Sequence, residues 1–261
     1  MANSALSRSD ERLIHALHRR KAREAQGFFL AEGIRVVEEL VASGLTIKLA
    51  VVSSELEDNS RGRALIAKLS QRTDVSVVPD HVLRAAAATE NPQGVLAVAH
   101  EPESNLDALT QATASRVLVC DAVQDPGNLG TLIRVADAFA LDAVVLLPGT
   151  VDPWNPKVVR SAAGSSFRMP QIPAAIAELK EWFNKHEYRA LGADTTGDPL
   201  DVDALPPRVA LVVGNEGAGL RADTRTLLDA LVRIPMPGPA ESLNVAVAAG
   251  ILLYALTRGS K

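Results

Sequence analysis

A glycine-rich loop with a single carboxylate is the stretch of this sequence best suited to hold a ligand. Gly214, Gly217 and Gly219 surround Glu216, and the loop follows the apolar run Leu211-Val-Val213, which has strand character. Three glycines in six positions let main-chain N–H and C=O groups come close to a bound molecule. A turn that only closes a buried strand is the plain alternative. Glu216 favours a functional role, because a carboxylate among glycines has little apolar packing to do.

Two further loops have a similar composition and also follow expected strands. Residues 124–130 read Gln-Asp-Pro-Gly-Asn-Leu-Gly, and residues 235–244 run from a proline to an asparagine. Ligands of open α/β sheets bind outside the carboxyl ends of the strands, so we expect the three loops to form one site. The polar groups that could act there are Asn128, Arg134, Glu216, Ser242 and Asn244.

Arg134 is expected about one turn into the helix that follows residues 124–130, outside its apolar stripe. A guanidinium at this place could hold a phosphate or stabilise a developing oxyanion, and a surface salt bridge is the alternative. Asn128 and Asn244 could equally serve as helix caps, which is a common use of asparagine.

Several site classes lack their sequence signals. The chain has no Gly-x-x-x-x-Gly-Lys-Ser/Thr and no Gly-x-Gly-x-x-Gly after a strand, which argues against a Walker-type nucleoside triphosphatase and a dinucleotide-dependent oxidoreductase. Among the five histidines only His15 and His18 are close in sequence, so we expect no metal site. Cys120 is the only cysteine, which excludes an internal disulfide, and we interpret it as a buried strand residue.

Length and composition predict a globular protein of two domains. The chain has 261 residues, of which 47% are hydrophobic and 22% are charged. The start lacks the apolar core of a signal peptide, and the longest apolar run, residues 245–256, is too short for a bilayer span. We therefore expect a cytoplasmic protein without a membrane partner.

The net charge of −4 hides a basic segment near the start of the chain. Residues 8–23 carry six basic and two acidic side chains, which gives +4 there and −8 for the remainder. A basic patch on an acidic body is compatible with RNA as a partner, and a solvated helix face is the alternative. Aromatic residues make up only 3%, so base stacking is not expected as a general binding mode.

The order of the expected elements indicates two α/β units joined near residues 101–115. In the first unit we expect helices at residues 10–26, 32–43, 63–70 and 81–88 and strands at 28–30, 47–52, 75–78 and 94–99. In the second we expect strands at 117–121, 144–147, 189–193, 209–213 and 232–235, with helices after residue 130 and at 155–164, 176–186, 224–230 and 244–257. The last helix is apolar nearly all round, so it needs cover from the core or from a second subunit.

Taken together, the three loops resemble the motifs of the SpoU/TrmH family of RNA ribose 2′-O-methyltransferases, in the SPOUT superfamily. The first motif is matched by Asp125-Pro-Gly-Asn-Leu-Gly130 with Arg134, the second by Gly214-Asn-Glu-Gly-Ala-Gly-Leu220, and the third by Ile234-Pro-Met236 with Ser242-Leu-Asn-Val-Ala-Val-Ala248. Residues 155–164 resemble the helix that follows the second strand of these enzymes. Phe29-Leu-Ala-Glu-Gly33 and Asn91-Pro-Gln-Gly94 resemble the family's auxiliary RNA-binding module.

The resemblance implies a fold and a cofactor. Residues 106–261 would form an α/β methyltransferase domain with a mostly parallel sheet and a C-terminal trefoil knot, and residues 1–105 a smaller α/β domain similar to certain ribosomal proteins. S-adenosyl-L-methionine would be the methyl donor. The residues expected to bind it are Gly214, Gly219, Ile234, Met236 and Leu243. A homodimer through the knotted domain would cover the apolar last helix.

The resemblance also implies a reaction, in which a ribose 2′-oxygen attacks the sulfonium methyl group. It places Arg134 at that hydroxyl. Because arginine stays protonated, we expect it to bind the adjacent phosphate and stabilise the emerging oxyanion. Asn128, Glu216, Ser242 and Asn244 would position the nucleotide and the loops. RNA contacts are expected from Arg19, Arg20, Lys21 and Arg160.

The expected substrate is structured RNA, and the auxiliary domain favours 23S ribosomal RNA over transfer RNA by analogy. A transfer-RNA 2′-O-methyltransferase is one alternative. A non-catalytic RNA-binding factor for ribosome assembly, with the same fold, is the other. The presence of Arg134, Asn128, Glu216 and Asn244 argues against the non-catalytic interpretation.

Overall fold

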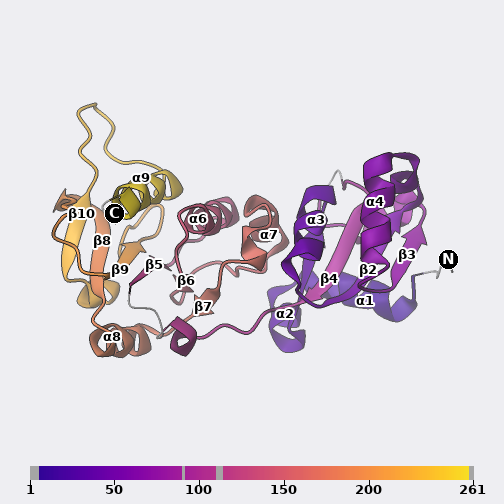
Figure 1. Ribbon diagram of the computed structural model, residues 1–261, viewed down its shortest axis with the longest axis horizontal. Helices are drawn as coiled ribbons and strands as arrows, with labels where there is room; N and C mark the ends of the chain where they lie inside the picture. The colour runs from indigo at the N-terminus through magenta and orange to yellow at the C-terminus, as the bar shows by residue number, and fades with distance from the viewer. Residues whose placement is uncertain (1–5, 90–91, 110–113, 259–261) are drawn as a thin grey trace. The chain divides into compact units, whose positions relative to one another are not determined.

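The computed structural model describes residues 6–89, 92–109 and 114–258, which belong to two compact units (Figure 1). One unit comprises Met1–Glu103 together with Asp152–Phe167, and the other comprises Ser104–Val151 and Arg168–Lys261. From the sequence, residues 152–167 were expected in the second domain, residues 106–261, and not in the first.

Aromatic packing explains why residues 152–167 belong to the first unit. Phe29 stacks on Trp154 with ring centroids 4.4 Å apart and on Phe167 at 5.6 Å, and all three rings are buried in one core. Such pairs add to the free energy gained by burying the rings themselves. An apolar core therefore captures this short segment, although it is distant in the chain.

A four-stranded sheet of order β1-β4-β2-β3 forms the centre of the first unit. The strands are β1 (Phe28–Glu32), β2 (Ile47–Ser53), β3 (Val75–Val78) and β4 (Val95–His100), of which only β2 and β3 pair in parallel. Helices α3 (Ile34–Ser43) and α4 (Ser60–Leu69) pack on one face, and α1 (Arg8–Leu17) and α5 (Asp80–Ala86) on the other. Helix α7 (Pro156–Ser161) contacts β1.

The single helix expected at residues 10–26 is wrong, because the structure breaks it into α1 and α2 (Arg20–Gln26). Arg19 between them has an extended conformation, with φ −99° and ψ 130°. The break lets Arg23 turn inward, where its Nη1 donates to the carbonyl of Leu17 at 2.6 Å and its Nε to Asp152 at 2.8 Å. A buried ion pair and a satisfied helix end thus replace a continuous helix.

The stretch 29–33 and residues 92–94 meet beside the start of α3. Gln93 Oε1 accepts a hydrogen bond from the Ile34 N–H at 3.1 Å, and the buried Glu32 carboxylate accepts one from the Ala88 N–H at 2.8 Å. Asn91 lies outside the described residues. These contacts give both stretches a role in joining the loop before β4 to the end of β1.

A six-stranded parallel sheet of order β10-β8-β9-β5-β6-β7 forms the centre of the second unit. Its strands are β5 (Ser115–Cys120), β6 (Ala143–Leu146), β7 (Gln171–Pro173), β8 (Arg189–Pro199), β9 (Arg208–Val213) and β10 (Ala230–Arg233). Helix α8 (Ile176–Lys185) packs on one face. Helices α6 (Pro126–Ala138) and α9 (Val245–Arg258) contact each other and the central strands. Cys120 is fully buried in β5, as expected.

Three expectations for this unit needed correction. The helix expected at 224–230 is only a 3-10 turn, Thr224–Leu227, because β10 begins at Ala230 and pairs with β8. Strand β8 extends six residues beyond the expected end at residue 193. Strand β7 was not expected, because its three residues include a proline and lack any alternating pattern. No helix within the described residues is long and apolar enough to cross a membrane.

Candidate active site

The three glycine- and proline-rich loops follow the carboxyl ends of β5, β9 and β10, as the sequence predicted. Strands β5 and β9 are direct neighbours, with Cys120 paired to Val213 at the ends from which two of the loops leave. Because neighbouring parallel strands end at the same edge of a sheet, the first and second loops lie side by side.

Glu216 joins the second loop to the first. Its carboxylate accepts hydrogen bonds from the Asp125 N–H and from Asn128 Nδ2, both at 3.0 Å, and from the Gln124 N–H at 3.2 Å. These donors lie at the start of α6, where N–H groups have no partner inside the helix. Asp125 itself caps α6 by accepting from the Asn128 N–H at 2.8 Å. The carboxylate thus holds the loop against the helix start.

The network continues from α6 to α9 through two asparagines. Asn244 Nδ2 donates to Asn128 Oδ1 at 2.9 Å, while Asn244 Oδ1 caps α9 by accepting from the Ala246 N–H at 2.9 Å. Each amide is thereby fixed in orientation by its neighbours. Glu216, Asn128 and Asn244 form one hydrogen-bonded chain that ties all three loops together. The capping alternative holds for Asn244 at the same time but is wrong for Asn128, because Asp125 caps α6.

The surroundings of Glu216 favour its charged form. Partial burial alone would raise the pKa of this carboxyl, but hydrogen bonds from the Asn128 side chain and from the backbone N–H groups of Asp125, Glu216 and Gln124 hold it below its ordinary value. Glu216 is therefore an ionised hydrogen-bond acceptor at neutral pH and not a proton donor.

The second loop doubles back on itself. The backbone groups of Asn215 and Gly219 bond each other in both directions at 2.9 Å, and Asn215 Oδ1 accepts from the Gly217 and Ala218 N–H groups. A Cβ at Gly214 would lie 2.3 Å from the carbonyl carbon of Gly219, so only glycine fits there. Gly219 itself has φ +68°, which favours glycine as well.

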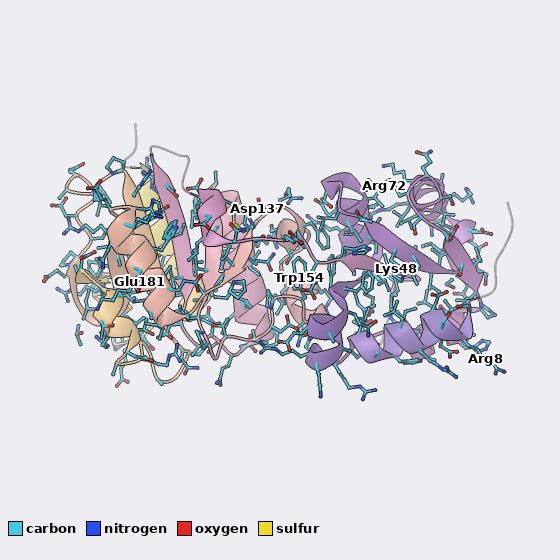
Figure 2. The ribbon with its side chains drawn as sticks, turned by 90° about the horizontal axis from the view of Figure 1, so that it is seen from below. Arg8, Lys48, Arg72, Asp137, Trp154 and Glu181 are labelled. Atoms are coloured by element: carbon cyan, nitrogen blue, oxygen red, sulfur yellow. The ribbon has the colours of Figure 1, made fainter. Side chains whose placement is uncertain are left out.

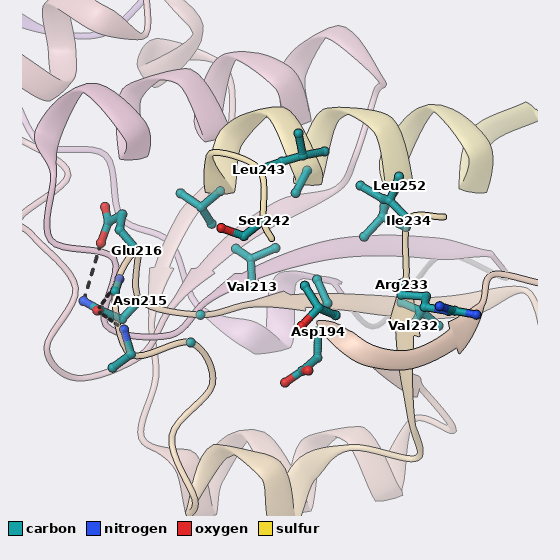
Figure 3. Close-up of a pocket in the computed structure, with 18 of the residues that line it drawn as sticks. Asp194, Val213, Asn215, Glu216, Val232, Arg233, Ile234, Ser242, Leu243 and Leu252 are labelled. Atoms are coloured by element: carbon teal, nitrogen blue, oxygen red, sulfur yellow. Dashed lines mark hydrogen bonds between the residues drawn. The ribbon is translucent and has the colours of Figure 1, made fainter. Parts of the chain in front are cut away.

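A cavity of about 350 Å³ lies between the second and third loops (Figure 3). Figure 3 shows Glu216 near one end and Arg233 near the other, with Leu243 on the side of α9. The five residues predicted to bind the cofactor all line this cavity, and Glu216 and Ser242 line it too; the five are Gly214, Gly219, Ile234, Met236 and Leu243. The structure therefore brings the second and third motifs into one concave site.

Strand β8 adds a wall to the cavity that the sequence did not predict. Ala193, Asp194 and Thr195 line it, because β8 lies between β9 and β10. Asp194 is paired with Arg225 and accepts from the Thr196 N–H at 2.9 Å, and these interactions hold the pKa of its carboxyl below its ordinary value against the effect of burial. The sequence predicted a strand at residues 189–193 but gave no signal for its place between β9 and β10.

Arg134 is exposed on α6 and lies outside the residues that line the cavity. Its guanidinium has no hydrogen-bond or ion-pair partner among the residues that the structure describes. The salt-bridge alternative for this side chain is therefore wrong, and Arg134 is available to a ligand.

The predicted RNA-binding side chains all belong to the first unit. Arg19, Lys21 and Arg160 are exposed and have no carboxylate partner within the described part of the chain, while Arg20 pairs with Glu24 at 2.7 Å. Figure 2 shows Arg8 at the free surface of α1. Arg23, which the sequence counted in the basic segment, is buried against Asp152 and cannot contribute to the patch.

An apolar stripe lies exposed beside the site. Leu243, Val247, Ile251 and Tyr254 are 37%, 51%, 43% and 50% exposed, the only large hydrophobic side chains so exposed in residues 6–89, 92–109 and 114–258. Three of them line a hollow of about 720 Å³ that also includes Asn128 and Asn244. Over the same described ranges, no group of three or more His, Cys, Asp or Glu side chains could hold a metal ion.

Comparison with protein families gives two matches. The SpoU rRNA Methylase family matches residues 115–254, and the MRM3-like substrate binding domain matches residues 12–97. The chain is 42% identical over 244 residues to the 23S rRNA (guanosine(2553)-2′-O)-methyltransferase RlmP of Bacillus subtilis, with 92% of both chains covered. It is 32% identical to the 23S rRNA (uridine(2479)-2′-O)-methyltransferase of Streptomyces viridochromogenes, over 93% of this chain and 86% of that protein.

Solved structures agree with these matches. The SpoU methyltransferase AviRb from Streptomyces viridochromogenes, in complex with the cofactor AdoMet, has a TM-score of 0.86 at 30% identity and covers 97% of this chain and 98% of its own. The AdoMet-bound rRNA methyltransferase from Sinorhizobium meliloti has a TM-score of 0.84 at 30% identity, with 99% and 97% covered. Both the motifs and the whole-chain similarity lead to one conclusion: the chain belongs to the SpoU rRNA methylase family.

Proposed function

We propose that this protein transfers a methyl group from S-adenosyl-L-methionine to a ribose 2′-oxygen of 23S ribosomal RNA. The observation that carries the proposal is the cavity enclosed by the second and third motif loops, beside the hydrogen-bonded chain that joins both loops to the first motif. Relatives that cover more than nine-tenths of this chain are named 23S rRNA 2′-O-methyltransferases, which supports the reaction and the RNA class.

The cavity fits S-adenosyl-L-methionine in size and in chemistry. Apolar side chains of Val213, Ile234, Leu243 and Leu252 suit the adenine, and the glycine loop offers backbone groups. The space beside Gly219 is open, with no atom within 4 Å of the place a Cβ would take. When bound, the cofactor would supply an electrophilic methyl group on a sulfonium.

The side chains of the first motif would organise the attacking ribose. A ribose hydroxyl is a poor nucleophile near neutral pH, so it must be oriented and its negative charge stabilised. The unpartnered guanidinium of Arg134 suits the adjacent phosphate and the emerging oxyanion. Glu216, Asn128 and Asn244 would act as positioning residues, because their polar atoms already bond one another and the loops. Ser242, which lines the cavity, would position the nucleotide or the third loop.

Each domain would have its own task. Residues 1–105 would bind the RNA, with contacts from Arg19, Arg20 and Lys21. Arg160 would add a contact from the segment 152–167, which belongs to the first compact unit. The remainder of residues 106–261 would bind the cofactor and carry out the transfer. The match of residues 12–97 to a substrate binding domain supports this division.

We also propose that the second domain is knotted and dimeric. The chain leaves β10 at the sheet edge and returns as α9 against α6 and β9, near the sheet centre, which supports a trefoil knot of the last segment with the loops before it. The exposed apolar stripe of Leu243, Val247, Ile251 and Tyr254 is suited to a second copy of the same surface. A ribosomal RNA substrate supports a cytoplasmic location for the protein.

Methyl transfer from radiolabelled S-adenosyl-L-methionine tests the proposal. Purified protein would be mixed with unmodified 23S rRNA, 16S rRNA and transfer RNA. The two ribosomal RNAs would also be supplied within assembling ribosomal particles. We expect label at one nucleotide of 23S rRNA. Label in transfer RNA alone would replace the substrate by the tRNA alternative. Cofactor binding without label in any RNA would favour the non-catalytic assembly factor.

A further inference from the structure

Asp121, which follows β5, contacts both ends of the glycine-rich second loop. Its backbone N–H donates to the carbonyl of Val213, just before the loop, at 2.8 Å. Its carboxylate accepts from the backbone N–H of Arg221, just after the loop, at 2.9 Å and from Arg221 Nε at 2.6 Å. One residue directly after β5 therefore holds both ends of residues 214–220.

This contact is unusual because the carboxylate is fully buried. The Asp121 side chain is 0% exposed, whereas that of Arg221 is 33% exposed. Burying a charge is costly unless it is paired and hydrogen-bonded, and here both oxygens of the carboxylate have donors from Arg221. A hydrophobic residue would fill the same space at the end of a strand without that cost, so stability alone does not explain the choice of aspartate.

The contact between Asp121 and Arg221 affects the cavity, because Arg221 directly follows the backbone that forms one cavity wall. The peptide that links Gly219 and Leu220 lies against Gly214 so closely that a Cβ at Gly214 would come within 2.5 Å of the Leu220 nitrogen. Gly214 and Gly219 both line the cavity. Holding the Arg221 N–H therefore fixes the backbone that forms this wall.

We propose that Asp121 and Arg221 are positioning residues, which form a clasp that preorganises the cofactor-binding loop. The inference rests on the proposed function, because it assigns the clasp to the same cavity. It adds a second attachment of the loop, at its two ends, to the one made by Glu216 in its middle. Preorganisation lowers the ordering cost of binding, so the clasp should act mainly on cofactor affinity.

The substitution Asp121→Asn tests the clasp, because an amide must turn its NH2 group toward one of the two Arg221 donors. Asp142→Asn is the matched control in the same sheet. Asp142 accepts from Ser115 Oγ and from the Arg116 N–H, both at 2.8 Å, through the single oxygen Oδ2, which an amide oxygen can replace. Asp142 lies beside the amino ends of β5 and β6, whereas Asp121 follows the carboxyl end of β5. Asp142 is not among the residues that line the cavity.

We expect Asp121→Asn to weaken S-adenosyl-L-methionine binding by about tenfold or more in calorimetry, well below its unfolding temperature. KM for the cofactor should rise by a similar factor while kcat at saturation changes less. Asp142→Asn should keep wild-type affinity even if its Tm falls. Equal affinity of folded Asp121→Asn and wild-type protein, or equal weakening by both variants, would overturn the proposal.

Two measurements keep the test decisive. If Asp121→Asn does not fold, Arg221→Met removes the guanidinium but keeps the backbone donor, and Arg221→Lys should recover part of the affinity that Arg221→Met loses. Hydrogen exchange of the Asn215 and Gly219 amides, which bond within the loop, should be about tenfold faster in the cofactor-free variants. Unchanged exchange would overturn the clasp, whereas failure of wild-type protein to bind the cofactor would overturn the proposed function instead.

Discussion

Arg134 is the side chain on which the proposed chemistry depends most. Replacing it by alanine should lower methyl transfer by about 100-fold or more, because an oxyanion partner is lost. Cofactor affinity should stay within about threefold of wild type, since Arg134 does not line the cavity. Steady-state transfer and calorimetry measure the two effects separately.

Arg168→Ala is a suitable control for that variant. Arg168 is also an exposed arginine of the second unit, but it pairs with Asp137 of α6 at 3.0 Å. Its removal should leave transfer close to the wild-type rate. Full turnover by Arg134→Ala would show that the assigned role is wrong.

Single residues of the site were predictable where the residue type limits what it can do. Glu216, a carboxylate among glycines, lines the cavity together with the five cofactor residues that the family resemblance implied. Arg134 lies outside this cavity, and its role stays a prediction. Two of the partners of Glu216 were not predictable, because they are backbone N–H groups of another loop. The role of Asp121 was missed, because the residues around it in the sequence do not show that its carboxylate is buried against Arg221, which is 100 residues further along the chain.

At the scale of elements, Glu101 at the end of β4 makes stability depend on pH. Burial, with the nearby Asp152 carboxylate, raises the pKa of Glu101 from 4.5 to about 7, and Arg23 offsets this only in part. Between these two values the unfolded chain loses the Glu101 proton while the folded chain keeps it. Folded stability is therefore lost as the pH rises through this interval.

Glu101→Gln should remove this loss. The urea midpoint of the variant minus that of wild type should increase as the pH is raised from about 5 to about 8. Glu103→Gln, an exposed carboxylate two residues further along, provides the control and should follow the wild-type curve. Parallel curves for Glu101→Gln and wild type would contradict the raised pKa.

The start of α2 is expected to bind RNA through charge. Replacing Arg19, Arg20 and Lys21 by glutamine should weaken RNA binding and reduce the slope of log affinity against log salt by about two, since Arg20 already shares its charge with Glu24. Filter binding over a salt series measures this slope.

Arg61→Gln with Arg84→Gln removes similar charges from the same unit, but both arginines pair with carboxylates, those of Glu38 and Asp80. This control should keep the wild-type slope. An unchanged slope for the triple variant would return its side chains to a merely solvated helix face.

Most elements followed from hydrophobic periodicity, and the exceptions depend on contacts between distant parts of the chain. The break between α1 and α2 depends on the buried pair of Arg23 and Asp152, residues that are far apart in the chain. Strand β7 is too short to show a pattern, and the turn Thr224–Leu227 gives way to sheet pairing of β10. In each case a tertiary contact decides what local propensity leaves open.

At the scale of the whole molecule, the apolar stripe on α9 predicts self-association. Val247→Glu with Ile251→Glu should convert the proposed dimer into monomers at micromolar concentration, because charges would be buried in the interface. Sedimentation velocity measures the change. Ala177→Glu, on the exposed side of α8, adds charge elsewhere in the same unit and should leave the dimer intact. A monomeric wild-type protein would contradict the prediction.

The two-unit organisation followed from the order of elements, but the assignment of residues 152–167 did not. This segment joins the first unit because Trp154 and Phe167 pack on Phe29, and no local pattern announces such a return. The strand order of the second sheet was equally hidden, and with it the wall that β8 gives to the cavity.

Identification of the methylated atom tests the central claim most directly. RNA labelled by the protein would be digested to nucleosides and the methylated nucleoside identified by mass spectrometry, with a transcript carrying 2′-deoxyribose at the mapped nucleotide as the control. The account predicts the methyl group on a ribose 2′-oxygen of 23S rRNA and no label in the deoxy transcript. A methyl group on a base, or undiminished labelling of the deoxy transcript, would contradict it.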